Sequence, residues 1–272
     1  MAVNLASKYS SVVDERFSIA SVTNIAFNRD YDWLGVQTVN VYSIETAPMN
    51  DYARTGANRY GTPAELQDTT QELKLTQDRA FTFTIDRGND IDQMNIKGAG
   101  RALRRQLDEV VIPELDTYRL AQLVANAGKT EVAVATATNA YQLFLKGQEA
   151  LGEAKVPAVG RVAYVTYSYF NMLKLDPSFV KQGDMSQAML VTGALGMVDN
   201  VPLIPVPQSY LPANVQFVIV NPLAACAPVK LSDFTIHENP PGINGNLVEG
   251  RLYYDAFVLS NKQGAIYVSS AA

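Results

Sequence analysis

Apolar residues recur at helical spacing through residues 92–127, DQMNIKGAGRALRRQLDEVVIPELDTYRLAQLVANA. The apolar stripe consists of Ile96, Ala99, Leu103, Leu107, Val110, Leu115, Tyr118, Ala121 and Val124. The opposite face is charged, and Arg105 stands four residues before Glu109, a spacing that modestly supports a helix. Asp92 is suited to cap the start and Gly128 to end it. The pattern predicts a helix of about 32 residues, roughly 48 Å long if straight.

Pro113 interrupts this predicted helix. It has no N–H to donate to the carbonyl of Glu109, and its ring crowds the preceding turn, so we expect a kink or a split there. The length is itself unusual, because helices in globular proteins average about 11–12 residues. Such a rod indicates a subunit whose extended shape matters more than a pocket.

An alternating pattern predicts a long two-stranded β-hairpin over residues 36–86. The stretch 36–44, VQTVNVYSI, is rich in β-branched residues, while ELKLT at 72–76 and RAFTFTID at 79–86 alternate apolar and polar positions. The polar, glycine- and proline-containing segment between them predicts an elaborated tip. An isolated hairpin is only marginally stable in water, so this one needs another surface to lie on.

The predicted tip carries side chains of types that are enriched at protein interfaces. They are Tyr52, Arg54, Arg59 and Tyr60. We predict that these four residues contact a neighbouring subunit, and an ordinary sheet edge with a long loop is the alternative. The first 30 residues show no sustained period and are interpreted as an N-terminal arm that is ordered only if something holds it, with a flexible terminus as the alternative.

The rest of the chain alternates between predicted strands and short helices. Strands are expected in EVAVATAT, RVAYVTY, VQFVIVN and APVKLSDFTIH, helices from Asn139 to about Ala154 and in SYFNMLKL, and an extended segment in VPLIPVP. The stretches EGRLYYDAFVLSN and GAIYVS are predicted to form a terminal hairpin across residues 261–264. The expected class is α+β with much antiparallel pairing.

Composition narrows the possible functions. The chain has 272 residues, of which 47% are apolar, and a formal net charge of -5. A substantial core is therefore expected, and the lack of a strongly basic patch argues against a dedicated nucleic-acid binder. Cys226 is the only cysteine, which fits a reducing compartment. No apolar run approaches 18 residues and no signal peptide is evident, so a cytoplasmic protein is expected.

Residue types suited to catalysis or metal binding are sparse. His237 is the only histidine, so one chain cannot form a triad that needs histidine or a multi-histidine metal site. Cys226 lies among alanines and is interpreted as a buried, inert thiol.

The densest acidic cluster is Asp86, Asp90 and Asp92. An EF-hand loop counted from Asp86 would need Gly at its sixth position and Glu at its twelfth, where this chain has Ile91 and Lys97. The cluster is therefore interpreted as turn and helix-cap chemistry. The sequence predicts no catalytic residue, no cofactor and no metal site.

Three stretches carry a resemblance to a known family: AGRALRRQLDEVVIPELDTYRLAQL, then RTGANRYGTPAEL with LTQDRAFTFTID, and finally APVKLSDFTIHENPPGINGNLVEGRLYYDAFVLSNKQGAIYV. The chain resembles the major capsid proteins of tailed bacteriophages that have the HK97-like fold, through most of its length. The resemblance implies an N-terminal arm at 1–33 and an extended hairpin, the E-loop, at 34–92. It further implies a peripheral (P) domain with the long spine helix at 93–157 and 229–272, and an inserted axial (A) domain at 158–228.

The resemblance also implies a function. Subunits of this family self-assemble as hexamers and pentamers into the icosahedral head shell, which encloses double-stranded DNA without sequence-specific binding. The implied protein is not an enzyme, has no cofactor and no membrane partner, is assembled in the cytoplasm of a host bacterium and is located in the virion capsid. The chain has no long N-terminal extension, so a separate scaffolding protein is expected beside the portal.

Two other readings stay open at this point. An encapsulin-like compartment that holds cargo enzymes uses the same fold, and a hydrolase or binding protein with scattered carboxylates is the contrasting class. Autocatalytic crosslinking, found in part of the capsid family, is not expected because Lys74 is the only lysine in residues 31–96 and lies away from the hairpin tip.

Overall fold

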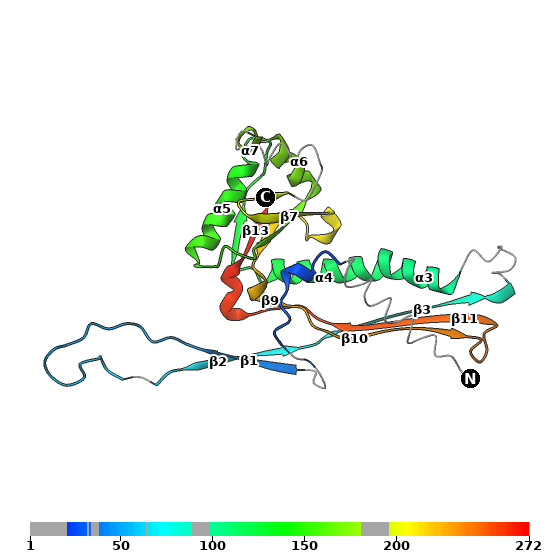
Figure 1. Ribbon diagram of the computed structural model, residues 1–272, viewed down its shortest axis with the longest axis horizontal. Coiled ribbons are helices and arrows are strands. Elements are labelled where there is room, and N and C mark those ends of the chain that lie inside the picture. The colour runs from blue at the N-terminus through cyan, green and yellow to red at the C-terminus, as the bar shows by residue number, and fades with distance from the viewer. Residues whose placement is uncertain are drawn as a thin grey trace. The chain divides into compact units, whose positions relative to one another are not determined.

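The computed structural model describes residues 21–31, 33, 38–63, 65–88, 98–180 and 196–271. The chain divides into two units, of which one is Trp33–Leu75 and the other combines Met1–Asp32 with Thr76–Ala272 (Figure 1). The predicted cap Asp92 and the first apolar position of the long helix, Ile96, lie outside the described residues.

The smaller unit is a two-stranded hairpin. Strand β1 (Thr38–Ile44) pairs antiparallel with β2 (Asp68–Lys74) along their whole length. The alternation of residues 79–86 was predicted to extend this hairpin, and that prediction is wrong. These residues belong to β3 (Gln77–Asp86), which pairs with β11 in the larger unit, where Phe81 and Phe83 pack against a buried cluster. Local alternation could not distinguish these two partners.

The long helix is continuous through Pro113. It consists of α3 (Ala99–Gln106), the π-helical turn Leu107–Val111 and α4 (Ile112–Ala125). In the wide turn the N–H of Ile112 donates to the carbonyl of Leu107, five residues back. Because a π turn spaces the backbone more widely than an α turn, it accommodates a proline that can neither donate an N–H nor approach the preceding carbonyl closely. The helix is therefore not split at this residue.

The π turn also changes which side chains are buried. The buried apolar positions along the helix are Leu103, Leu107, Ile112, Leu115, Leu120 and Leu123. The step from Leu107 to Ile112 is one residue longer than an α-helical step, so Ile112 takes the core position that the helical period assigned to Val110. Val110 is 46% exposed, and its predicted core position is wrong.

Gly128 was expected to end the helix, and that prediction is also wrong. The helix ends at Ala125 with Asn126 as its C-cap. The N–H of Gly128 instead donates to the carbonyl of Gln263 at 3.0 Å. A Cβ at this position would lie 2.6 Å from that carbonyl, so glycine is required here for the close approach of two backbone segments.

The first half of the helix packs on a three-stranded antiparallel sheet with the order β10-β11-β3 (Figure 1). Strands β10 (Val229–Glu238) and β11 (Gly245–Tyr254) lie beside β3. Gly250 occupies the centre of this packing, where a Cβ would lie 2.4 Å from the Phe81 ring and 2.7 Å from the Phe234 ring. The glycine therefore lets these two rings stack across β11, with centroids 6.0 Å apart.

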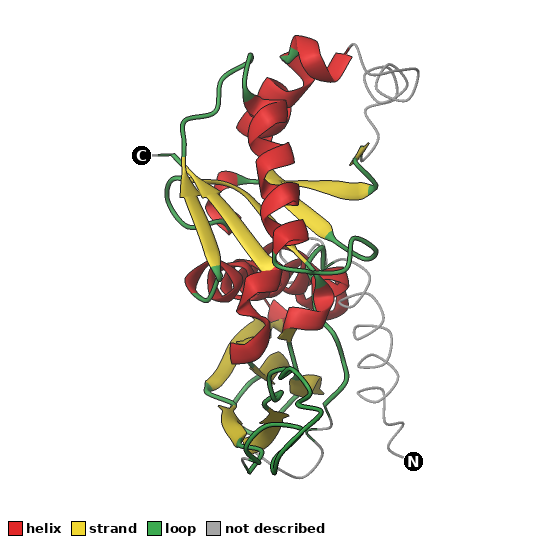
Figure 2. Ribbon diagram, turned by 90° about the vertical axis from the view of Figure 1, so that its left-hand side faces the viewer, coloured by secondary structure: helices red, strands yellow, loops and turns green. Residues whose placement is uncertain are grey.

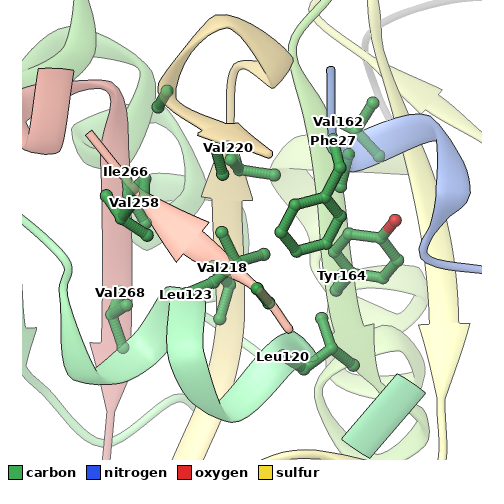
Figure 3. Packing of buried hydrophobic residues seen from close by; sticks show 14 of the residues in the cluster. Phe27, Leu120, Leu123, Val162, Tyr164, Val218, Val220, Val258, Ile266 and Val268 are labelled. Carbon is green, nitrogen blue, oxygen red and sulfur yellow. The ribbon is translucent and has the colours of Figure 1, made fainter. Parts of the chain in front are cut away.

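The second half of the helix packs on a six-stranded mixed sheet with the order β4-β13-β8-β5-β7-β6. Its strands are β4 (Lys129–Val132), β5 (Val162–Thr166), β6 (Met197–Val198), β7 (Val201–Val206), β8 (Val215–Val220) and β13 (Ile266–Ser270). Helix α4 covers one face with Leu120 and Leu123, where Tyr164 and Val218 also lie (Figure 3). Helices α5 (Ala140–Glu153) and α6 (Tyr167–Leu175) cover the opposite face (Figure 2).

The predicted terminal hairpin does not form. Strand β11 belongs to the three-stranded sheet, whereas β13 pairs with β4 and β8 in the six-stranded sheet. Two short elements lie between them, β12 (Phe257–Val258), paired with β9 (Ala225–Cys226), and the 3-10 segment Ser260–Ala265. Strands β11 and β13 each have an apolar face. Each face is buried in a different sheet under the helix.

The remaining short elements are the 3-10 turns Asn24–Ala26, Gln208–Tyr210 and Pro222–Ala224 and helix α7 (Pro177–Val180). Predicted helices at 139–154 and in SYFNMLKL correspond to α5 and α6. The predicted strand EVAVATAT is shorter, because β4 ends at Val132. Within the described ranges, no helix has both the length and the apolar character needed to cross a bilayer.

Two glycine substitutions should have opposite effects on stability. Gly250→Ala forces a methyl group into the Phe81 and Phe234 rings, so we expect the free energy of unfolding to fall by about 1–3 kcal/mol. Gly152→Ala in α5 meets no atom within 4 Å and should raise it by roughly 0.4–1 kcal/mol, since alanine restricts the unfolded chain. Urea denaturation of the unassembled subunit measures both. Equal stability of the two variants would contradict this packing at Gly250.

Candidate subunit interface

The segment between β1 and β2 closes on itself. The N–H of Glu45 donates to the carbonyl of Gln67 at 3.1 Å, where the two strands end. Nearer the tip, the N–H of Ala53 donates to the carbonyl of Arg59 at 2.9 Å. These bonds join the two sides of the long excursion, so the tip is a folded loop held by its own backbone.

Two glycines and an asparagine make the turns of this tip possible. Gly56 and Gly61 have φ values of 87° and 93°, and Asn58 has a φ of 55°, all in the left-handed region that most side chains avoid. The N–H of Gly61 donates to the carbonyl of Asn58 at 2.9 Å. A Cβ on Gly61 would also lie 2.6 Å from Nδ2 of Asn50, so both backbone angle and space favour glycine.

The structure brings the predicted interface residues together at this tip. The rings of Tyr52 and Tyr60 meet edge to face with centroids 5.0 Å apart, and Tyr60 remains 84% exposed. Nε of Arg59 donates to the carbonyl of Gly56 at 3.2 Å. Arg54 is exposed on the same loop. Two aromatic rings and two guanidinium groups are thus presented to solvent on an ordered turn, and their contact with a neighbouring subunit stays a prediction.

Further exposed apolar side chains on the hairpin were not singled out from the sequence. Met49 is 98% exposed, Tyr42 68%, Ile44 69% and Leu66 54%. Tyr42 and Ile44 alternate along β1, and such alternation is usually the signature of a buried strand face. We call Tyr42, Ile44, Met49, Tyr52, Tyr60 and Leu66 the hairpin surface. Each of these side chains is exposed, and exposed large apolar side chains on one element are typical of an interaction site.

A buried polar cluster in the larger unit holds the N-terminal segment on α4. Asp116 is 1% exposed and accepts hydrogen bonds from the hydroxyls of Ser21 and Thr23, both at 2.5 Å, and from the N–H of Val22 at 3.1 Å. Arg119, one turn further along α4, donates from Nη1 to Thr23 Oγ1 at 3.2 Å. The two hydroxyls therefore bridge two buried, opposite charges, and this holds the residues from Ser21 onward in place.

The environment of Arg119 is strongly desolvated. Its side chain is 3% exposed, and burial lowers its pKa to about 10, which leaves it charged at neutral pH. Nη1 also donates to Oδ1 of Asn24 at 2.8 Å, and the guanidinium lies 5.7 Å from the centroid of the Phe27 ring. The sequence contained one signal of this site, an acid and a base three residues apart on α4, but no pattern linked them to residues 21–24.

The described residues contain no group of three or more His, Cys, Asp or Glu side chains arranged to hold a metal ion. Nε2 of His237 lies 3.4 Å from Oε2 of Glu249, with both side chains exposed, and Asp90 of the acidic cluster lies outside the described residues. Cys226 is 2% exposed, and burial raises the pKa of its thiol to about 12, so it is protonated at neutral pH.

A pocket of about 130 Å³ lies between the π turn and the three-stranded sheet. Its lining is mainly apolar and includes Val110, Phe81 and Tyr254. The carboxylate in its described lining, Glu114, accepts a hydrogen bond from Nε of Arg79 at 2.7 Å. Its described lining therefore holds one carboxylate, which is paired, among mainly apolar walls.

Comparison with known proteins identifies the fold. No family model and no curated protein matches the sequence. A chain of Mycobacterium phage Che8 matches with a TM-score of 0.74 and 20% identity, covering 91% of this chain and 89% of that chain. The capsid structure of the cyanophage P-SCSP1u matches with a TM-score of 0.69 and 10% identity, covering 91% and 86%.

A third match is the virus-like particle from Pyrococcus furiosus, with a TM-score of 0.62 and 12% identity over 98% of this chain and all (100%) of that one. Similarity at such low identity shows a shared fold. The α+β class and the HK97-like fold are thereby confirmed. The boundaries of the arm, E-loop, P domain and A domain stay predictions.

The folded tip should contribute little to the stability of the isolated subunit. Replacing residues 48–66 by a short glycine-rich turn removes Tyr52 and Tyr60, whose recorded ring contact is with each other. We expect the melting temperature of the unassembled subunit to change by less than about 2 °C, since a surface loop adds little to a core of this size. Differential scanning calorimetry measures it, and a large decrease would place the loop in the fold of the monomer.

Proposed function

We propose that this chain is the major capsid protein of a tailed bacteriophage, the subunit that assembles into the icosahedral head shell. The observation that carries the proposal is the hairpin surface, which exposes large apolar side chains on an ordered hairpin. The shared fold supports it, because the matched chains include capsid structures covered over most of their length. The function is structural, and the described part of the chain presents no catalytic constellation.

The mechanism of such a subunit is geometric. One copy presents the hairpin and the next presents the surface that receives it, so identical subunits associate head to tail and close into rings. We propose that hexamers and pentamers form in this way and join into the shell. The hairpin surface of each copy lies over the P domain of its neighbour, with Arg54 and Arg59 at the tip making polar contacts there. Burial of apolar area then stabilises the assembly without a larger monomer core.

The fold suggests how the proposed domains divide. The three-stranded sheet with α3 forms the proposed P domain, and the six-stranded sheet with α5 and α6 forms the proposed A domain. The range 158–228 for the A domain is therefore widened in this proposal, because α5 and β13 pack within the six-stranded sheet. The long helix runs through both.

The proposed partners follow from the shell. The chain carries a net charge of -5, which suits a container that encloses double-stranded DNA without gripping it, although salt screens most of that repulsion. A separate scaffolding protein and a portal complete the proposed assembly. The protein would be located in the virion capsid after assembly in the cytoplasm of a bacterial host.

An encapsulin-like compartment is the alternative within the same fold. The virus-like particle from Pyrococcus furiosus keeps it open, because a particle outside the matched phages shares the fold over 98% of this chain. Genes for a terminase and a portal beside this gene would support the phage head. A neighbouring gene for a peroxidase or a ferritin-like cargo protein would support the compartment. A carboxylate-based enzyme has no supporting observation among the described residues.

Charge reversal at the tip should block assembly. We expect the wild-type subunit to form closed polyhedral shells in electron micrographs, and Arg54→Glu with Arg59→Glu to reduce shell yield at least tenfold, because a reversed charge at an interface is repelled by its former partner. Arg54→Lys with Arg59→Lys keeps the charge and is the matched control. Sedimentation velocity measures the yield. Wild-type protein that stays monomeric in several buffers would refute the proposed function.

Replacement of Pro113 tests the role of the π turn in shell geometry. Pro113→Ala restores an N–H that can donate to the carbonyl of Glu109, so an α turn can replace the π turn. The side chains before the turn would then rotate against the three-stranded sheet. We expect shells of altered diameter or reduced yield in electron micrographs. Shells of unchanged size and yield would show that the turn does not influence curvature.

A further inference from the structure

Asp255 is a buried carboxylate at the junction between β11 and β12, and its side chain is 3% exposed. Oδ2 accepts hydrogen bonds from the N–H of Thr76 at 2.8 Å and from its hydroxyl at 2.9 Å. Oδ1 accepts from the hydroxyl of Tyr118 at 2.6 Å and from the N–H of Ala256 at 2.8 Å. Both oxygens therefore accept two hydrogen bonds each, which offsets the cost of burying the polar side chain.

These donors come from three separate parts of the chain. Thr76 is the first residue of the larger unit after the hairpin unit ends at Leu75. Tyr118 lies on α4, near the point where the long helix passes from the three-stranded to the six-stranded sheet, and packs edge to face on Tyr254 at 5.6 Å. Ala256 directly precedes β12. Asp255 thus joins Thr76 to the long helix within the larger unit.

In the bond between Tyr118 and Asp255, the tyrosine hydroxyl is the donor. Burial and the neighbouring Asp255 raise the pKa of the Tyr118 hydroxyl far above its ordinary value, so the oxygen keeps its proton at any pH near neutrality. The two bonds from Thr76 use its backbone and its side chain together, so they restrict the residue's orientation as well as its position. A pair of apolar side chains could fill the same space, but it would not impose a direction on the chain at Thr76.

The geometry points to Asp255 as the positioning residue of the hairpin: it pins the pivot at Thr76 to the long helix through Tyr118. In a shell, a shift of α4 would then carry with it Thr76, the residue that follows the hairpin unit. The consequence for shells rests on the proposed function. The pinning itself is a property of the unassembled subunit and can be measured without assembly.

The test places one spin label on each side of the pivot. The labels are attached to cysteines introduced by Glu72→Cys on β2 and Ala125→Cys on α4, two exposed positions. The native thiol is removed by Cys226→Ala. Pulsed electron–electron double resonance then gives the distribution of distances between the labels. Asp255→Asn keeps the side-chain shape but replaces an acceptor oxygen by an amide that donates. We expect the distribution to become at least twice as broad as in the wild type.

A matched control separates positioning from stability. Glu131 on β4 also accepts a hydrogen bond from a tyrosine hydroxyl, that of Tyr267 at 2.6 Å, within the six-stranded sheet. Glu131→Gln removes a comparable interaction away from the pivot, so the width of the distance distribution should stay that of the wild type. The melting temperature of every variant is measured in parallel.

The outcomes distinguish this inference from the proposed function. A distribution of the same width in Asp255→Asn and the wild type, whether both narrow or both broad, overturns the role of Asp255. If Asp255→Asn does not fold, Tyr118→Phe and Thr76→Val decide, because each removes one hydroxyl donor; broadening in both supports pinning and wild-type widths overturn it. Failure of the wild type to form shells would refute the proposed function and leave the label measurement unaffected.

Discussion

The larger unit depends on one long helix that must bury its apolar side against two different sheets. Its first half covers the three-stranded sheet through Leu103 and Leu107, and its second half covers the six-stranded sheet through Leu120 and Leu123. Neither sheet is completed by one continuous piece of sequence, since strands from distant parts of the chain meet under the helix. The helix therefore connects the two sheets through its buried side chains. A rotation of the helix about its axis would change the packing in both cores.

The chemistry along this helix meets that demand. The π turn before Pro113 adds one residue to the step between buried positions, so that Leu107 and Ile112 both face the core. Further along, Asp116 holds the N-terminal segment and Tyr118 donates to Asp255 at the exit of the hairpin. Two segments far from the helix in sequence are thus attached to it through directional hydrogen bonds to buried carboxylates, while apolar packing supplies most of the favourable free energy.

In the hairpin unit, unlike under the helix, large apolar side chains remain exposed. Its tip is ordered by its own backbone hydrogen bonds and by glycines with positive φ, yet Met49, Tyr42 and Ile44 remain largely exposed. A monomer gains nothing from presenting such side chains to water. In a shell, identical copies would cover these side chains, and this is the reason for the capsid function that we propose.

Periodicity by itself determined the long helix, α5, α6 and most individual strands, because a helix or strand face must repeat with the backbone whatever it packs against. Residue type, and not periodicity, singled out Tyr52, Arg54, Arg59 and Tyr60 in the polar loop, and their contact with a neighbouring subunit stays a prediction. The partners of β3, β11 and β13 were decided only by the tertiary structure, because an alternating strand fits several neighbours equally well in sequence. The burial of Ile112 in place of Val110 follows from a π turn within the helix, which the α-helical period does not predict. The roles of Asp116 and Asp255 depend on partners 93 and 179 residues away, which meet them only in the folded chain.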